Sequence, residues 1–427
     1  MATLRCTAIQ WVNQGEMGDY VTEYGAFYHQ VTVSGLSSFH FRVCFYNTTP
    51  NAHVFAIRMG TPRGEAIMRW VWDANRNDPV RENATLTFGR NGNLILADAD
   101  GRVVWQTNTA NKAVTGIKLL STGNLVLHDK NGRFLWQSFS HPTDTLLGGQ
   151  SVRLDVTKKL ISRTSAEDGS DGLYSLEIAR NGFVMYMDHS GTALQYGGWG
   201  RDNQIEAVTF VSEKHHIDEA FYLTLNFVVN GSASGGFDLV RLNYNNTYSF
   251  LRLGSDGNLK TFTYYEKVVE GAWMPTFSYF SGTFVMECRL PMKCGSLGLC
   301  QEGMCVACPQ RQGMLGWSEM CAPPKLPSSS CKASASVDYY KIDGVEHFLS
   351  RNVEGVGPMK VEECREKCSK DCKCVGFFYW RESSKCWVVP FLRTIRKVEE
   401  SSHTAYIKFS KQEFHLPTLF SIVSFHR

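Results

Sequence analysis

The chain has 427 residues, which is more than a single hydrophobic core usually organises, so two or more domains in series are expected. Hydrophobic residues make up 43% and charged residues 20%, both within the range of globular proteins. The net charge of +3 is too small to indicate nucleic acid as a partner. No run approaches the roughly 20 apolar residues that span a bilayer, so no membrane span is expected.

The N-terminal part of the chain gives the first indications of where the protein resides. Residues 1–10 contain no apolar run of seven or more, so no signal peptide is visible in the chain as given. Cys6 and Cys44 are the only cysteines before residue 288, and the sequence leaves their state open. Four sequons nevertheless predict N-glycosylation and hence secretion, at Asn47, Asn83, Asn230 and Asn245.

A repeat with an offset of 31 residues follows. Residues 91–96 (Asn-Gly-Asn-Leu-Ile-Leu) precede the Trp-Gln-Thr of 105–107, and residues 122–127 (Thr-Gly-Asn-Leu-Val-Leu) precede the Trp-Gln-Ser of 136–138. In each copy a Gly-Asn turn leads into a strand-like apolar run, and an Asp-x-x-Gly hairpin turn leads out of it. Each repeat is therefore predicted to form a small antiparallel sheet.

Three tryptophans mark the ends of three related units. Trp72 precedes Trp105 by 33 residues, and Trp105 precedes Trp136 by 31. Small sheets cannot bury their apolar faces alone, so three of them packed around an axis, with these tryptophans inward, would share one core. The repeat thus predicts a threefold β-prism.

A fainter version of the same pattern occurs downstream. Residues 181–186 begin with Asn-Gly and are followed by Trp199, and residues 255–259 (Ser-Asp-Gly-Asn-Leu) are followed by Trp273. This pattern predicts a second, diverged prism between about residues 155 and 285.

The remaining twelve of the fourteen cysteines fall between Cys288 and Cys386, a density that indicates an oxidising compartment. The first half of this region has too little apolar material for an unaided core, so we expect a disulfide knot rather than a redox or zinc Cys-x-x-Cys site. The cysteines of the predicted knot are Cys288, Cys294, Cys300, Cys305, Cys308 and Cys321.

A helix is predicted after the linker that begins at Pro323, over residues 361–368. Cys364 and Cys368 share one face of this helix and point in parallel, so they should staple the helix to neighbouring strands instead of bonding each other. Cys374 and Cys386 flank a strand-like segment and are the natural partners.

These features together resemble a known plant architecture. The motifs at residues 71–79 and 136–147, the knot spacing, and Cys-x3-Cys-x3-Cys-x-Cys at 364–374 resemble the bulb-type lectin, S-locus-glycoprotein-like, EGF-like and PAN/apple series of S-receptor kinase ectodomains. Residues 18–24 and 44–50 look closest to the secreted EP1-like glycoproteins of plant cell walls.

The resemblance implies an all-β, multidomain fold: tandem β-prism II (bulb-lectin-like) domains, a small EGF-like disulfide knot and a C-terminal PAN/apple α+β domain. It also implies three disulfides, Cys364–Cys386, Cys368–Cys374 and Cys331–Cys372. The expected domains are a bulb-type lectin domain at 20–152, a diverged S-locus-glycoprotein-like domain at 153–286, an EGF-like segment at 287–325 and a PAN/apple domain at 331–409.

Bulb-type lectins bind mannose through Gln-x-Asp-x-Asn-x-Val-x-Tyr, in which amide and carboxylate groups donate to and accept from adjacent sugar hydroxyls. In this chain both repeat copies lack the Gln and the Tyr, and a third series places Lys260 where the Val packs. No series is complete, so the sequence favours turn-forming asparagines over classical mannose contacts. The candidate carbohydrate-binding residues are Asn91, Asn93, Asn124, Asp256 and Asn258.

Catalysis has no recognisable basis in the sequence. The pair His215-His216 lacks a zinc-protease context, and no nucleophile elbow or phosphate-binding glycine loop occurs. Residues 98–101 begin like a calcium loop but fit a hairpin turn better. We therefore expect no catalytic residue, cofactor or metal, and two functions compete: recognition of glycans or cell-wall polysaccharides in the apoplast, and engagement of receptor kinases or other extracellular proteins through the PAN module.

Overall fold

The computed structural model describes residues 9–15, 23–38, 40–60, 68–155, 159–200, 204–214, 221–242, 248–265, 273–282, 286–328, 331 and 337–411. Cys6, Asn245, His215-His216 and residues 18–22 of the EP1-like segment lie outside these ranges. The chain divides into two compact units, residues 1–284 and 285–427, which are described in turn.

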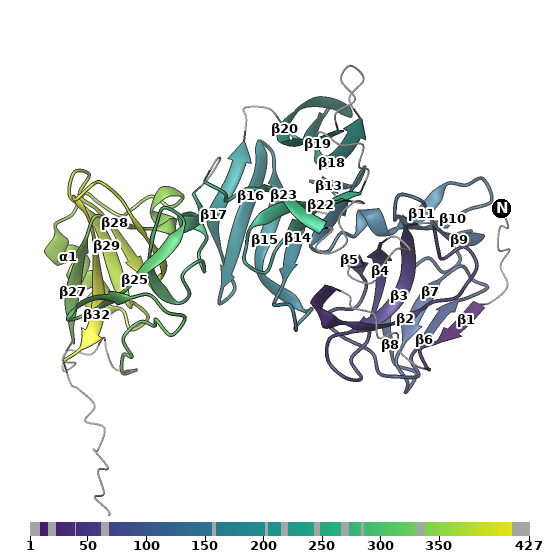
Figure 1. Ribbon diagram of the computed structural model, residues 1–427, viewed down its shortest axis with the longest axis horizontal. Coiled ribbons are helices and arrows are strands. Elements are labelled where there is room, and N and C mark those ends of the chain that lie inside the picture. The colour runs from purple at the N-terminus through teal and green to yellow at the C-terminus, as the bar shows by residue number, and fades with distance from the viewer. Residues whose placement is uncertain are drawn as a thin grey trace, which may run out of the picture. The chain divides into compact units, whose positions relative to one another are not determined.

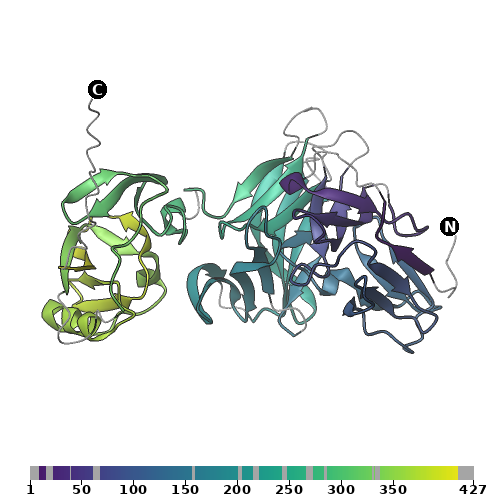
Figure 2. The ribbon, with the colours of Figure 1, turned by 90° about the horizontal axis from the view of Figure 1, so that it is seen from below.

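The first prism forms the N-terminal part of unit 1, and its strands run from purple to blue in Figures 1 and 2. Among the described residues it comprises three antiparallel sheets. The strand orders are β1(Ile9–Val12)-β6(Thr85–Phe88)-β7(Leu94–Ala97)-β8(Val103–Gln106), β2(Phe27–Gln30)-β3(Phe41–Asn47)-β4(Val54–Met59)-β5(Arg69–Asp73) and β11(Phe134–Gln137)-β10(Leu125–His128)-β9(Gly116–Leu119), with 3-10 turns η1(Glu23–Gly25) and η3(Ser138–Ser140).

The three predicted tryptophans meet in the core of this prism. The ring centroids of Trp72 and Trp105 are 6.0 Å apart, those of Trp72 and Trp136 6.1 Å, and those of Trp105 and Trp136 5.7 Å. Each pair is edge-to-face, with interplanar angles of 71°, 73° and 76°, an arrangement that aromatic quadrupoles favour. The predicted threefold prism is confirmed.

The second prism is also confirmed, and it too comprises three antiparallel sheets in the described ranges. The strand orders are β12(Thr145–Leu147)-β21(Ser249–Leu253)-β22(Leu259–Tyr264)-β23(Trp273–Ser278), β13(Ser151–Arg153)-β18(Ala207–Lys214)-β19(Phe221–Val229)-β20(Ser232–Leu242) and β14(Lys159–Arg163)-β15(Asp171–Ala179)-β16(Gly182–His189)-β17(Thr192–Gly200). Strands β12 and β13 begin before residue 153 yet pair with β21 and β18. The division of the chain at 152/153 stays a proposal.

The two downstream tryptophans have different surroundings. Trp199 stacks on Phe227 with centroids 4.9 Å apart, within the second prism. Trp273 contacts Phe250 and Tyr264, with centroids 5.1 and 5.6 Å away, in a core cluster that also contains residues of the first prism. Trp273 therefore helps to join the prisms.

Buried arginines also join the two prisms. Arg76, which follows β5, donates from Nε to Asp171 Oδ1 at 2.7 Å and from Nη2 to the carbonyl of Ile161 at 2.9 Å. Arg163 at the end of β14 donates to the hydroxyl of Tyr46 on β3 at 2.7 Å. Charge-assisted hydrogen bonds of this kind are shorter and stronger than neutral ones, so the junction has a defined geometry.

A third arginine completes the junction. Arg252 on β21 is buried and donates to the carbonyl of Trp70 at 2.5 Å and to Thr145 Oγ1 at 2.9 Å. Its Nη1 forms an ion pair with Glu23 of η1. The guanidinium thus bridges the second prism to the first.

Unit 2 comprises, in its described part, two sheets and one α-helix. The sheets are β26(Gly313–Gly316)-β25(Met304–Gln310)-β24(Leu297–Gln301)-β31(Arg393–Lys397)-β28(Val345–His347) and β27(Val337–Asp343)-β32(His403–Ser410)-β29(Gly376–Trp380)-β30(Lys385–Val389), accompanied by α1(Val361–Lys370), η4(Glu287–Arg289) and η5(Phe348–Arg351). Strands β24 and β31 pair in parallel, so the segments predicted as EGF-like and PAN domains share one sheet.

The predicted helix is confirmed, and its cysteines face inward. Cys364 and Cys368 are fully buried and bond Cys386 and Cys374, respectively. The helix begins where the backbone amide of Lys360 donates to the carboxylate of Glu363, one half of a capping box. No helix in the described part of the chain is long and apolar enough to cross a membrane.

The other disulfides lie around the knot and at the entry to the PAN part. Cys331 bonds Cys372, which together with the two helix bridges reproduces the pairing that the resemblance implies. The knot contains Cys288–Cys300, Cys294–Cys305 and Cys308–Cys321, so Cys305 and Cys308 bond different partners instead of each other. Trp317 is half-buried, and its indole donates to the carbonyl of Cys294 at 3.3 Å. Cys44 on β3 forms no disulfide within the described part of the chain, and burial raises its pKa to about 11.

Candidate functional site

The first candidate carbohydrate position, Asn93, is used inside the fold. It is 4% exposed, and its Nδ2 donates to Gln106 Oε1 at 2.8 Å. Its Oδ1 accepts from the amide of Thr109 and from the hydroxyl of Thr107, both at 3.0 Å. The side chain therefore clamps the turn before β7 to the end of β8.

The same clamp recurs in both prisms. Asn124 Nδ2 donates to Gln137 Oε1 at 2.9 Å, and its Oδ1 accepts from the amide of Phe139 at 3.2 Å. Asn258 Nδ2 donates to the carbonyl of Phe280 at 3.1 Å, and its Oδ1 accepts from the amide of that residue at 3.1 Å. These amides satisfy buried backbone and side-chain groups, which is the structural role that the sequence favoured.

Asn91 and Asp256 stabilise the turns locally. Asn91 Oδ1 accepts from the amide of Asn93 at 3.1 Å, and Asp256 Oδ1 accepts from the amide of Asn258 at 2.9 Å. Such bonds from a side chain to the backbone two residues on are typical of Asx turns. Asp256 Oδ2 also lies 2.5 Å from Lys260 Nζ. The five candidates occupy three separate turns in two prisms, so the structure does not bring them into one site.

The two glutamines that bond the clamp asparagines of the first prism lie in a motif that the sequence repeats. Gln106 and Gln137 follow the repeat tryptophans in Trp-Gln-Thr and Trp-Gln-Ser, but the pattern alone did not reveal their partners. Their role depends on the register of β7 with β8 and of β10 with β11, which places each glutamine beside the turn asparagine.

Replacing Asn124 with alanine should therefore reduce stability. The change leaves the part-buried amide of Phe139 and the buried hydroxyl of Ser138 without their acceptor, which costs about 1–3 kcal/mol. The control Asn91→Ala alters an exposed turn residue, so we expect a cost below about 1 kcal/mol. Urea denaturation of the full chain measures both, and equal losses would contradict the clamp.

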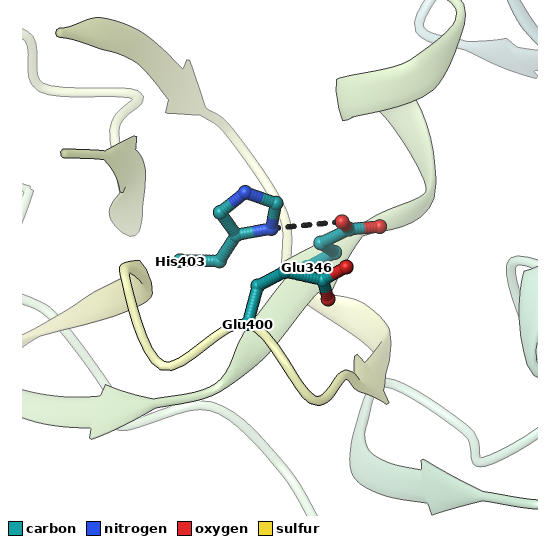
Figure 3. A group of neighbouring side chains, drawn as sticks. All are labelled: Glu346, Glu400 and His403. Atoms are coloured by element: carbon teal, nitrogen blue, oxygen red, sulfur yellow. Dashed lines mark hydrogen bonds and ion pairs between the residues drawn. The ribbon is translucent and has the colours of Figure 1, made fainter. Parts of the chain in front are cut away.

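A cluster of charged side chains in unit 2 was not predicted from the sequence. Glu346, Glu400 and His403 each offer one atom that could ligate a metal ion, and these three atoms lie within 4.8 Å of one another. Figure 3 shows the ring of His403 directed at Glu346, with Glu400 beside it. His403 Nδ1 is 2.9 Å from Glu346 Oε1, and its Nε2 is 2.5 Å from Glu382 Oε1. His403 thus contacts one carboxylate through each of its ring nitrogens.

Glu346 is ionised in this cluster. Burial alone would raise its pKa, but the hydrogen bond and charge of Arg396 outweigh burial and lower it. The same Oε2 also lies 3.4 Å from Arg351 Nε. A cation at this position would have to displace these arginines and compete with His403, so we interpret the cluster as a charge network that ties β28, β31 and β32 together.

The sequons differ in exposure. Asn47 is 6% exposed and pairs with Phe27 inside a sheet, whereas Asn83 and Asn230 are exposed. A glycan needs a surface position, so Asn83 and Asn230 are accessible sites in the folded chain and Asn47 is not.

Glycopeptide mapping of protein secreted by plant cells should find glycans on Asn83 and Asn230, with Asn47 unmodified. An unmodified Asn47 is expected because a glycan there would have to pull a buried side chain out of β3. The variants Asn83→Gln and Asn230→Gln should each remove one glycan. A fully occupied Asn47 in folded protein would contradict the placement of this strand.

Comparison with known proteins agrees with this architecture. Residues 69–167 match the family described as D-mannose binding lectin. EP1-like glycoprotein 2 of Arabidopsis thaliana is 50% identical over 424 residues, covering 93% of this chain and 93% of the relative. The epidermis-specific secreted glycoprotein EP1 of Daucus carota is 45% identical over 359 residues, covering 78% of this chain and 91% of the relative.

A more distant relative is a receptor-like protein kinase. A G-type lectin S-receptor-like serine/threonine-protein kinase of Arabidopsis thaliana is 29% identical over 343 residues, covering 74% of this chain and 39% of the kinase. The predicted resemblance is confirmed, since a tandem-prism unit that matches a lectin family precedes a disulfide-rich unit along the chain. The chain belongs to the plant EP1-like glycoproteins.

Proposed function

We propose that this EP1-like glycoprotein is a secreted, non-catalytic protein of the plant apoplast that recognises carbohydrates through the two prisms of unit 1. The observation that carries the proposal is the bulb-type lectin architecture itself, in which a match to the D-mannose binding lectin family coincides with a threefold tryptophan core. Secretion is supported by six disulfides in the described part of the chain and by the printed name of the carrot relative.

Recognition by the classical mannose positions is disfavoured. Asn93, Asn124 and Asn258 already donate and accept within the fold, so a sugar would have to break these bonds before binding. A site that must break buried hydrogen bonds loses the advantage that complementary polar groups give. We therefore expect the protein to bind wall glycans elsewhere on unit 1, with weak or no preference for free mannose.

The direct test is binding of the full chain, produced in a plant secretory host, to immobilised mannan, xyloglucan, galactan and cello-oligosaccharides. We expect saturable binding to at least one neutral polysaccharide, with little competition by millimolar methyl α-mannoside. Enzymatically deglycosylated protein serves as the control, because it excludes effects of its own glycans. Flat traces on every surface would contradict carbohydrate recognition.

A second candidate function is protein interaction, favoured by exposed apolar side chains on the knot of unit 2. Most of them are methionines, which adapt to varied partners and are enriched at interfaces. They are Met304 and Val306 on β25, Met314 and Leu315 on β26, and Met320. Capture of a receptor kinase ectodomain that persists with added sugar and after glycan removal would support this function, and loss of capture under either condition would contradict it.

A further inference from the structure

Unit 1 contains a cavity at the junction of its prisms, and no residue of the three asparagine clamps lines it. Its volume is about 370 Å³, within the range of small-molecule sites. The walls come from residues 73–78, which begin with the last residue of β5, from Val104 on β8, from residues 142–143 between the prisms, and from β14 and β15. Segments of both prisms thus build the cavity, and Arg76 ties the segment after β5 to β14 and β15 through Ile161 and Asp171.

Three residues that line the cavity each have one buried atom with no hydrogen-bond partner among the described residues: Asp73 Oδ1, Arg76 Nη1 and Thr143 Oγ1. Asp73 and Arg76 are each only 7% exposed. The charged groups nearest to them lie too far away for hydrogen bonds, because Arg76 Nε is 3.9 Å from Asp73 Oδ1 and Arg76 Nη1 is 3.9 Å from Asp144 Oδ2. Buried polar groups in native proteins are almost always paired, so these three require a partner.

The state of Asp73 is consistent with a missing partner. Burial raises its pKa to about 6, the charge of Arg76 opposes this rise, and the charge of Asp144 adds to it. A carboxylate with a full set of donors would show the opposite shift. The group thus has unused capacity to accept a hydrogen bond.

The remaining wall groups define the charge of a suitable occupant. Asp78 is paired with Arg102 at 2.6 Å, and Asp171 is held by Arg76 and by Asn77, so neither carboxylate is free to bind a cation. An anion in the cavity would be repelled by three carboxylates, and a cation would be repelled by Arg76 and Lys159. The free atoms comprise an acceptor, a donor and a hydroxyl that does both, which matches the hydroxyls of a neutral sugar.

We propose that the junction cavity binds a neutral carbohydrate, whose hydroxyls pair with Asp73, Arg76 and Thr143 once these side chains turn their buried polar atoms into the cavity. This inference rests on the proposed function, since it assigns that function a place in the molecule. It places sugar binding at residues other than the clamp asparagines, because none of the clamp residues lines the cavity.

The test uses two matched variants of the full chain and isothermal titration with mannotetraose, cellotetraose and galactotetraose. Thr143→Val removes the unpaired hydroxyl and keeps the shape of the side chain. Thr87→Val makes the same change on β6, on a residue outside the cavity walls. We expect Thr143→Val to weaken binding of the preferred tetrasaccharide by about 3- to 10-fold and Thr87→Val to leave it unchanged. Thermal melts of both variants establish that they are folded.

The outcomes separate the two proposals. If the wild-type chain binds a tetrasaccharide and Thr143→Val binds it equally well, carbohydrate recognition stands and the cavity is not the site. If the wild-type chain binds none of the three and none of the polysaccharides, both proposals fail. A crystal soaked with the preferred sugar gives a direct readout: sugar between residues 73–78 and Thr143 supports the site, and ordered water alone there overturns it.

Discussion

Replacing Trp72 with alanine is expected to destabilise unit 1 by about 3–5 kcal/mol, the cost of deleting a large aromatic side chain from a packed core. Trp72 is 5% exposed and contacts both other tryptophans of the triad. Its indole also donates to the carbonyl of His141 at 2.8 Å, and that acceptor would lose its donor. The fold should loosen at the axis around which the three sheets of the first prism pack.

Two controls define this result. Trp72→Phe keeps an aromatic ring on the axis and should cost less than the alanine variant. Phe27→Ala removes an exposed aromatic ring from the same sheet and should change stability by no more than about 0.5 kcal/mol. Urea denaturation followed by tryptophan fluorescence measures all three. A loss for Trp72→Ala no larger than that for Phe27→Ala would contradict a core organised by the triad.

Replacing Arg252 with methionine is expected to cost about 3–5 kcal/mol, because it leaves part of a buried ion pair uncompensated. The guanidinium holds the carbonyl of Trp70, the hydroxyl of Thr145 and the carboxylate of Glu23. Methionine fills a similar volume but supplies no donor for these groups. The contact between the prisms, rather than the interior of either prism, should weaken.

Exposed arginines offer a matched comparison. Arg153 on β13 pairs with Asp155 at the surface, so Arg153→Met should cost no more than about 1 kcal/mol. Adding Glu23→Gln to Arg252→Met should cost less than the sum of the single changes, since the two residues interact. Hydrogen exchange and denaturation of the full chain measure both effects. Additive losses, or equal losses for Arg153 and Arg252, would contradict the role of Arg252 in the junction.

Elements with a local sequence pattern could be predicted. The tryptophan spacing, the Gly-Asn turns and the helix with Cys364 and Cys368 each reflect a period that secondary structure imposes on the chain. The same local reasoning favoured a structural role for Asn93, because the mannose motif around it lacks two of its polar residues. The helix pattern indicated Cys374 and Cys386 as the partners of the helix cysteines, and the resemblance supplied the individual pairs.

Features that depend on distant segments could not be predicted. Arg76 and Asp171 are 95 residues apart, and nothing in either local sequence indicates that docked prisms bring them together. The parallel pairing of β24 with β31 and the burial of Asn47 likewise depend on tertiary packing. The junction cavity is built from several such segments, which is why sequence reasoning placed its candidate site on the repeat turns instead.

Titration of the full chain with neutral wall oligosaccharides tests most directly whether the prisms recognise carbohydrate without the classical mannose positions. Saturable binding that Thr143→Val weakens and Asn91→Ala leaves unchanged is the predicted result. Absence of binding to every neutral glycan, or binding that Asn91→Ala abolishes while Thr143→Val has no effect, would contradict it.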